Sequence, residues 1–355
     1  MKTHKLLTNM LCLFCMAFSF AQSNTSTLKN KSIYGVVIDE KTKEPIAGAS
    51  IYFDNTTVGT ITTFEGEFTF DYDNKINASL VVSFVGYKTI VIPSPKYNEK
   101  YTILLAEDVS ALDEVYIEYK DEWSRAYKLK QFRKEFLGYS RFSRACKILN
   151  EDDIILRFNS KEKQLIAQSK NPIIIINEAL DYEIKYDLSE FVVDYGIGIG
   201  IREPVEDNKD KWYYFRSVYY AGTTFFKTIP SKNHKKALKN REKVYKGSVP
   251  HFMRSIANNS LKKDKYKIFK GSKQIPPELF IHTERIDSLN LTKVKISYRL
   301  NILYKNKYKS AIQSKVDTFT IDAFGNHNNI SEVLFGGFMG DQRLGETLPY
   351  GYGLE

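Results

Sequence analysis

Hydrophobic and polar residues alternate along the first hundred residues in a pattern that predicts short β-strands. In "SIYGVVID" (32–39), Ile33, Gly35 and Val37 fall on one side, and the stretch is rich in β-branched residues. Similar runs recur up to residue 107, and polar turns with Gly or Pro separate them about every 8–12 residues. Roughly seven short strands over residues 31–107 are typical of a β-sandwich.

Three glycines, Gly48, Gly59 and Gly66, interrupt this alternation at near-even intervals. We interpret them as turn residues between strands, with Gly66 supplying the positive φ angle that a tight turn needs. A ligand-binding loop is the alternative, but no ionisable side chain recurs around these glycines.

The pattern changes after residue 122. Apolar residues from Trp123 to Leu137 stand mostly three and four positions apart, which predicts an amphipathic helix that Gly138 ends. We expect residues 139–149 to continue this helical path. Residues 152–186 then indicate strands, with polar turns at 159–163 and 171–172.

A second helix is predicted near residue 250, and alternation returns after it. Ser248 suits the N-cap, Pro250 suits the first turn, and apolar residues from Phe252 to Leu261 line one side. Residues 291–327 alternate again, and the polar pair at 305–306 indicates a turn. The sequence therefore predicts a mainly β, α+β protein: a seven-stranded sandwich, then an α+β domain with a largely antiparallel sheet.

The first region resembles a known family. "GVVIDEKTKEPIAGASIYFDNTTVGTITTFEGEFTF", followed by "LVVSFVGYKTIVI", resembles the carboxypeptidase-like regulatory domain. The resemblance rests on Gly35, Asp39, Thr42, Pro45, Gly48, Ala49, Gly59, Thr60, Gly66, Phe68, Phe84, Gly86 and Tyr87. It implies a transthyretin-like sandwich. Such domains commonly precede TonB-dependent outer-membrane receptors and also occur on other exported envelope proteins.

"SALDEVYI" (110–117) resembles the segment that joins this domain to a receptor plug. The chain that follows is too short for a plug and a large barrel, so receptor function is not carried over. The segments 134–150, 239–261 and 340–352 resemble the downstream region of uncharacterised envelope proteins that bear the same domain. That resemblance brings no known activity.

The first 21 residues have the features of a secretory signal peptide. Lys2 and Lys5 precede an apolar run at 11–20, which is too short to span a bilayer. We therefore predict a signal peptide at 1–21, a sandwich at 31–107, a linker at 108–122 and an α+β domain at 123–355. No later segment is apolar enough for a transmembrane helix.

Removal of that peptide leaves Cys146 as the one cysteine, so the mature chain has no intramolecular disulfide. We interpret Cys146 as a small buried hydrophobic residue, and a reactive thiol is the alternative.

The chain is basic, with 52 Lys and Arg residues against 42 Asp and Glu. The excess is concentrated at 227–247 and 261–273. Outside a cell, such segments favour acidic glycans or an anionic membrane surface over nucleic acid. The alternative is a solvated helix face. The candidate residues for an anionic partner are Lys235, Lys236, Lys239, Arg241 and Lys243.

"KWYYFRSVYYAGTTFFKTI" (211–229) is the richest aromatic run. Flat aromatic faces on a sheet can stack on sugar rings, although half of these side chains would belong to a core. The candidates for stacking are Trp212, Tyr214, Tyr219 and Tyr220. The nearby "YGIGIGI" (195–201) lacks the glycine spacing of the dinucleotide fingerprint. We expect its glycines to leave one side of a strand bare, where an aromatic ring or another backbone can lie close.

Motifs for catalysis or a cofactor are missing from the sequence. It contains no His-Glu-x-x-His, no Gly-x-Ser-x-Gly and no phosphate-binding loop. His251 has no acidic or cysteine partner placed for a metal site. "DYDNKIN" (71–77) lacks the glycine and glutamate of a calcium loop and is interpreted as a polar turn. We expect no metal, no cofactor and no enzyme activity.

We therefore predict a non-catalytic, exported binding or scaffolding protein of the bacterial envelope, in the periplasm or at the outer membrane or cell surface. Its expected partner is an envelope protein or an anionic glycan or lipid surface, with peripheral membrane association and no nucleic acid. One alternative is an accessory component of a TonB-dependent transport system. Another is a glycan-processing enzyme whose carboxylates, about 5–10 Å apart, meet only in the fold.

Overall fold

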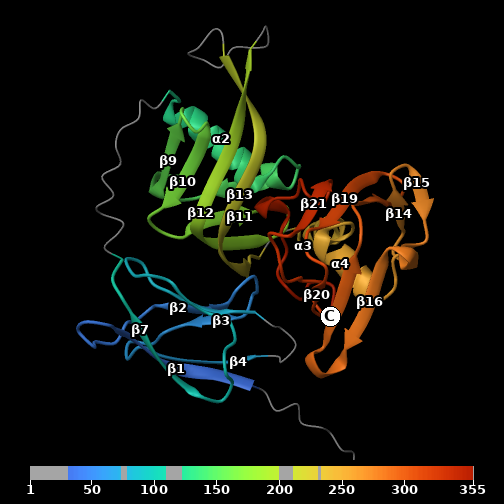
Figure 1. Ribbon diagram of the computed structural model, residues 1–355. Coiled ribbons are helices and arrows are strands. Elements are labelled where there is room, and N and C mark those ends of the chain that lie inside the picture. The colour runs from blue at the N-terminus through green and yellow to red at the C-terminus, as the bar shows by residue number, and fades with distance from the viewer. Residues whose placement is uncertain (1–30, 73–77, 109–121, 200–210, 231–232, 355) are drawn as a thin grey trace, which may run out of the picture.

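The computed structural model describes residues 31–72, 78–108, 122–199, 211–230 and 233–354 (Figure 1). Within these residues the protein is mostly β-sheet, with a small N-terminal sandwich followed by a larger region that also contains helices. This confirms the predicted fold class. The predicted signal peptide and most of the predicted linker, together with most of the 71–77 turn, lie outside the described residues.

Seven strands form the sandwich: β1 (Lys31–Asp39), β2 (Ser50–Phe53), β3 (Gly59–Ile61), β4 (Glu67–Tyr72), β5 (Leu80–Ser83), β6 (Ile90–Ile92) and β7 (Lys100–Leu105). One sheet has the order β4-β1-β7, with β1 and β7 parallel, and the other has the order β3-β2-β5-β6. Ile33 and Val37 of β1 are fully buried in the core between the sheets, as the alternation predicts.

The glycines of the sandwich do not all play the predicted role. Gly66 lies in a turn with φ 71°. Gly59 instead begins β3, where a β-carbon would lie 2.7 Å from the Cβ of Tyr52, so its interpretation as a residue between strands was wrong. At this position glycine is required by close packing rather than by a turn.

A helix and six strands follow: α2 (Arg125–Leu137), β8 (Cys146–Ile148), β9 (Ile154–Asn159), β10 (Gln164–Ser169), β11 (Ile173–Asn177), β12 (Tyr182–Ile199) and β13 (Lys211–Thr228). The strands form one antiparallel sheet in which β12 is central. Along one edge it pairs with β11 and then β10, and along the other it pairs with β13 over its whole length.

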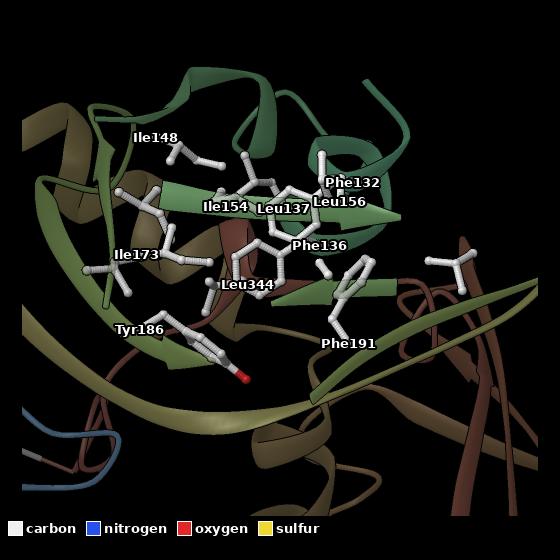
Figure 2. Close-up of a cluster of buried hydrophobic side chains, with 14 of the residues drawn as sticks. Phe132, Phe136, Leu137, Ile148, Ile154, Leu156, Ile173, Tyr186, Phe191 and Leu344 are labelled. Carbon is white, nitrogen blue, oxygen red and sulfur yellow. The ribbon is translucent and has the colours of Figure 1, made fainter. Parts of the chain in front are cut away.

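Helix α2 forms as the apolar spacing predicts and packs against one side of this sheet. The Ser124 side chain accepts from the N–H of Tyr127 at the N-cap, and Gly138, at φ 103°, follows the last turn. Phe132 and Phe136 are fully buried against sheet residues that include Phe191 (Figure 2).

The chain after Gly138 does not continue as a helix as expected. Residues 143–145 form one 3₁₀ turn, and β8 then pairs with β11. The backbone of residues 146–148 gains a strand partner from a distant segment, which the local pattern could not reveal.

The C-terminal part contains two further helices and eight strands: α3 (His234–Tyr245), α4 (Val249–Ala257), β14 (Tyr266–Lys270), β15 (Lys273–Ile275), β16 (Ile281–Ile286), β17 (Leu291–Ile296), β18 (Leu300–Tyr304), β19 (Tyr308–Ser314), β20 (Phe319–Ile321) and β21 (Val333–Gly337). They form sheets β15-β14-β18-β19-β21 and β16-β17-β20, with a core of their own that includes Phe252 and Phe319. Ser248 caps α4 as predicted.

The sandwich is docked directly on the sheet of β12 and β13. The turn after β2 lies along the outer edge of β13, where the N–H of Asn55 donates to the carbonyl of Thr224 at 2.7 Å and the N–H of Phe226 donates to the carbonyl of Thr56 at 2.9 Å. The ring of Tyr52 packs on that of Phe225, with centroids 5.2 Å apart. These contacts cover one end of the β13 edge and part of the adjoining sheet side.

Candidate functional site: an open sheet face with aromatic side chains

The hairpin of β12 and β13 extends beyond its neighbours in the sheet (Figure 1) and carries the aromatic run that the sequence singled out. Its register changes twice: one shift lies between Leu188 and Glu190 of β12, and at the other Asp194 pairs with Ser217, but Tyr195 pairs with Phe215. Arg216 is thus an extra residue, a β-bulge on β13. A bulge shifts the alternation of side chains by one position, so even-numbered residues before it lie on the same side as odd-numbered residues after it.

The bulge brings three of the four predicted stacking residues onto one side of the sheet. Trp212 and Tyr214 before the bulge share this side with Tyr219 after it, and each pairs with a residue of β12. Tyr214 is 43% exposed and Tyr219 is 57% exposed, so their rings meet solvent. We call this surface the open face, and its members are Trp212, Tyr214, Ser217, Tyr219, Val192, Asp194, Gln164 and Ile166.

The sandwich covers the other end of the same side. There the Lys185 ammonium donates to the Ser50 hydroxyl at 2.9 Å, and the Thr89 hydroxyl donates to the Asp187 carboxylate. Burial is the main cause that lowers the pKa of Lys185. One end of this sheet side is therefore an interdomain contact, and the other end is exposed.

Two glycines on β12 hold the aromatic rings against the sheet. Gly196 pairs with Tyr214 and Gly198 pairs with Trp212. A β-carbon at Gly196 would lie 2.2 Å from the Tyr214 ring, and one at Gly198 would lie 2.2 Å from the indole. Each ring thus packs closely against bare backbone, which confirms the sequence-based interpretation of these glycines. Because each ring rests on the strand, its orientation is set before any ligand arrives.

A row of polar side chains crosses the open face beside the rings. The Asp194 carboxylate accepts from the Gln164 amide at 2.8 Å and from the Ser217 hydroxyl at 2.8 Å. These groups are half-buried or exposed and hold one another in place. The face therefore offers aromatic planes together with fixed hydrogen-bonding groups, a combination that suits a polar ligand with flat apolar surfaces.

Tyr220, the fourth predicted stacking residue, was assigned to the wrong side of the strand. It points to the opposite side, where its ring lies 5.4 Å from that of Phe136 in the core beneath α2. Burial is also the main cause that raises the pKa of its hydroxyl. The bulge at Arg216 explains the error, because simple alternation places Tyr220 with Tyr214.

The predicted basic residues lie on α3, and four of the five are exposed: Lys235, Lys236, Lys239 and Lys243. Arg241 is the exception, and its prediction as a surface residue was wrong. It is 6% exposed, donates to the carbonyls of Leu180 at 2.7 Å and Asp181 at 3.1 Å, and lies 3.9 Å from the Tyr182 ring centre. Its charge holds α3 on the sheet, so it is unavailable to a partner.

Cys146 is half-buried against the core of the sheet, and burial raises the pKa of its thiol to about 12. At neutral pH it is therefore protonated, as expected for a packing residue rather than a reactive thiol. The Nδ1 atom of His251 lies 3.2 Å from the Gly247 nitrogen and 2.6 Å from the Tyr266 hydroxyl. Burial lowers the pKa of its imidazole to about 4.

The polar row of Asp194, Gln164 and Ser217 was missed from the sequence. Its members belong to three strands, and only the pairing of β10 with β12 and of β12 with β13 brings them together. The alternation of Val192, Asp194 and Gly196 was the one available signal, but it indicates a shared side and names no partner.

The described residues contain no candidate for a metal site or a membrane-spanning helix. No group of three or more His, Cys, Asp or Glu side chains in the described ranges could hold a metal ion. No helix in that part of the chain is long and apolar enough to cross a membrane.

Comparison with known proteins gives a match for the sandwich. Residues 33–117 match the family described as CarboxypepD_reg-like domain. Over 81 residues the chain is 35% identical to the TonB-dependent receptor SusC of Bacteroides thetaiotaomicron. This aligned segment covers 23% of this chain and 8% of the receptor. The matched segment is thus a small part of that relative.

Solved structures with a weaker likeness span more of the chain. A DUF3823 family protein from Bacteroides ovatus covers 83% of this chain and 99% of its own at 9% identity, with a TM-score of 0.18. A candidate carbohydrate-binding protein from Bacteroides uniformis covers 86% and 98% at 8% identity, also with a TM-score of 0.18. We draw no argument from likeness at this TM-score. Residues 33–117 thus match the CarboxypepD_reg-like domain, as the sequence resemblance implied, and the described part of this segment contains the sandwich.

Proposed function

We propose that this protein is a non-catalytic binding protein of the bacterial envelope and that its open face binds a glycan chain. The observation that carries the proposal is the packing of Trp212 against Gly198 and of Tyr214 against Gly196, beside the exposed Tyr219. Pyranose rings present flat C–H surfaces that pack on such aromatic planes.

The polar row supports the same ligand. Sugar hydroxyls both donate and accept hydrogen bonds, and the Asp194 carboxylate, the Gln164 amide and the Ser217 hydroxyl together offer acceptors and donors. The acyl chains of a lipid surface have no groups that could hydrogen-bond to this polar row. The sandwich covers one end of this sheet side, so a polymer on the open face would extend towards the exposed end of the hairpin.

The sandwich supports an envelope location. It is a CarboxypepD_reg-like domain, and the matched relative is a TonB-dependent receptor. We propose that the protein is exported to the periplasm or the outer surface, and that the sandwich holds the glycan-binding sheet in position there. A role as an accessory component of a TonB-dependent transport system is compatible with this placement and adds a protein partner for the sandwich.

Affinity electrophoresis tests the proposal. The purified protein would be run in native gels that contain amylopectin, xylan, galactomannan or laminarin. The open-face variant Tyr214→Ala/Tyr219→Ala should lose any retardation that the wild type shows. Phe215→Ala is the matched control, because Phe215 is 38% exposed on the opposite side of the same hairpin. Unchanged retardation of the open-face variant would refute the assignment of the site.

A further inference from the structure

Several lysines that lie away from the open face line two adjoining hollows in the C-terminal part. One hollow, of about 770 Å³, lies between the end of α3, the segment at 140–142 and the β18–β19 turn. The other, of about 990 Å³, lies between the β18–β19 turn and the segments around β14 and β15. Lys305 lines both hollows, so they adjoin at this residue, and we call the two together the lysine groove.

The groove is strongly cationic. Eight basic side chains line it against three glutamates; the basic residues are Arg141, Lys243, Lys246, Lys262, Lys265, Lys267, Lys305 and Lys307. Glu242 is already paired with Lys246. Folding thus brings members of both basic segments, 227–247 and 261–273, to the same place.

Most of these side chains form no ion pair among the residues that the structure describes, although the Glu242 carboxylate also interacts with Lys243 and Lys305 at longer range. Within the described ranges, no carboxylate lies at ion-pair distance from Lys265, Lys305 or Lys307, and all three are exposed. Like charges gathered in a concave surface raise its potential and attract a ligand of opposite charge. A solvated helix face, by contrast, would spread its lysines over a convex surface.

The backbone places two of these lysines at an energetic cost. Lys265 has φ 68° and Lys305 has φ 49°, both in the left-handed region that glycine and asparagine tolerate best. The two residues are joined, because the Lys305 N–H donates to the Lys265 carbonyl at 3.1 Å. The β18–β19 turn, with Asn306 also at positive φ, has the form that usually takes Asn-Gly. Lysine at these positions is unfavourable for folding, and Lys43 and Lys163 have a similar φ in other turns.

Aromatic rings lie along the groove between the charges. Tyr308 packs against Phe338 with ring centroids 4.4 Å apart, and the Lys307 ammonium lies 5.3 Å from the centre of the Tyr308 ring. A concave surface with both cations and aromatic rings fits a chain that carries acidic groups on sugar rings. A planar bilayer would touch only the rim of such a hollow.

We propose that the lysine groove is a second binding site, for an acidic polysaccharide that carries carboxylate, sulfate or phosphate groups. It shares no residue with the open face, so the proposal stands apart from the proposed function.

The test uses a variant that removes charge without disturbing the fold. Lys265→Asn/Lys305→Asn removes two charges and introduces a residue that accepts positive φ, so its melting temperature should equal or exceed that of the wild type. The matched control is Lys235→Gln/Lys239→Gln, which removes the same charge from exposed positions of α3 outside both hollows. Binding to polygalacturonate and heparin would be measured at 50 and 300 mM NaCl, together with vesicles of phosphatidylglycerol.

We expect the wild type to bind a polyanion in a salt-sensitive manner, with about tenfold weaker binding by the groove variant and less than about twofold weaker binding by the control. Retention on the neutral polysaccharides should be unchanged in the groove variant. The proposal is overturned by failure of the wild type to bind either polyanion, by equal losses in the two variants, or by binding that is confined to the vesicles.

Discussion

The main-chain N–H of Phe226 donates to the carbonyl oxygen of Thr56 at 2.9 Å, across 170 positions of the chain. The parallel bridge between Thr56 and Phe225 adds to this contact, and the Asp54 carboxylate accepts from the Thr224 N–H at 2.7 Å. Without the sandwich, this end of the β13 edge would present unpaired backbone groups, a common starting point for aggregation. The sandwich therefore protects the sheet that carries the open face.

Asp54→Ala should loosen this contact. Removal of the carboxylate leaves the Thr224 N–H without its acceptor in a buried position, which costs about 1–3 kcal/mol. Hydrogen exchange of the Thr224 and Phe226 amides should become faster. Asp71→Ala, at an exposed aspartate of the same domain, is the control and should leave both amides protected. Equal protection in the two variants would show that the sandwich does not depend on this contact.

Tyr219→Ala and Tyr220→Ala should separate binding from stability. Tyr219 is exposed, so its truncation should change the free energy of unfolding by less than about 0.5 kcal/mol. Tyr220 packs among Phe136, Tyr186 and Phe191, so its truncation should cost about 3–5 kcal/mol. Urea unfolding of the two variants checks this, and similar losses at both positions would contradict the register of β13.

Gly198→Val should displace the indole of Trp212. A β-carbon at this position would lie 2.2 Å from the ring, so the side chain has to leave the sheet surface. In a Trp123→Phe background, Trp212 is the one tryptophan left, and its emission should shift to longer wavelength as the ring becomes more exposed. Gly336→Ala is the control, because nothing lies within 4 Å of its position. An unshifted spectrum for Gly198→Val would show that the ring does not rest on this strand.

Stability should fall on acidification because of two half-buried histidines. Burial lowers the pKa of His251 to about 4 and that of His327 to about 4, below the value of about 6.5 in the unfolded chain. The unfolded state then binds more protons between these values, so the stabilisation present above pH 6.5 is lost as the pH falls towards 4. Burial raises the pKa of Asp54 and of Glu346, which acts in the opposite direction.

The variant His251→Asn/His327→Gln isolates the effect of the histidines. Each amide can supply one acceptor in place of an imidazole nitrogen but does not titrate in this range. Melting temperatures would be recorded from pH 7.5 to pH 4.5. The wild type should lose more stability over this range than the variant, and parallel curves would show that neither histidine contributes.

Much of the fold could be predicted from the local pattern of apolar and polar residues. The predictions that failed did so for physical reasons. Alternation in β1 and the cap at Ser248 were visible because each depends on neighbouring residues. The bulge at Arg216 was not visible, because a register shift depends on the pairing of two strands. Because Arg216 shifts the alternation by one position, Tyr220 faces the core and Tyr219 lies on the open face.

The basic residues show the same limit. Lys239 and Arg241 lie in one charged run, yet Arg241 is buried because the carbonyls of Leu180 and Asp181 accept from its guanidinium. The lysine groove was hidden for the same reason, since it joins Lys243 on α3 with Lys305 in a distant turn. The position of each basic side chain in the fold, rather than its residue type, therefore determines whether it can contact a partner.

The most direct test of the proposed function is the emission of Trp212 during titration with a retained polysaccharide. The Trp123→Phe variant would be titrated with the polymer that slows the wild type most in native gels. Stacking of a sugar on the indole should change the emission saturably, with the same midpoint as the binding curve. Unchanged emission while the polymer is bound would contradict the account, because the ligand would then lie away from the open face.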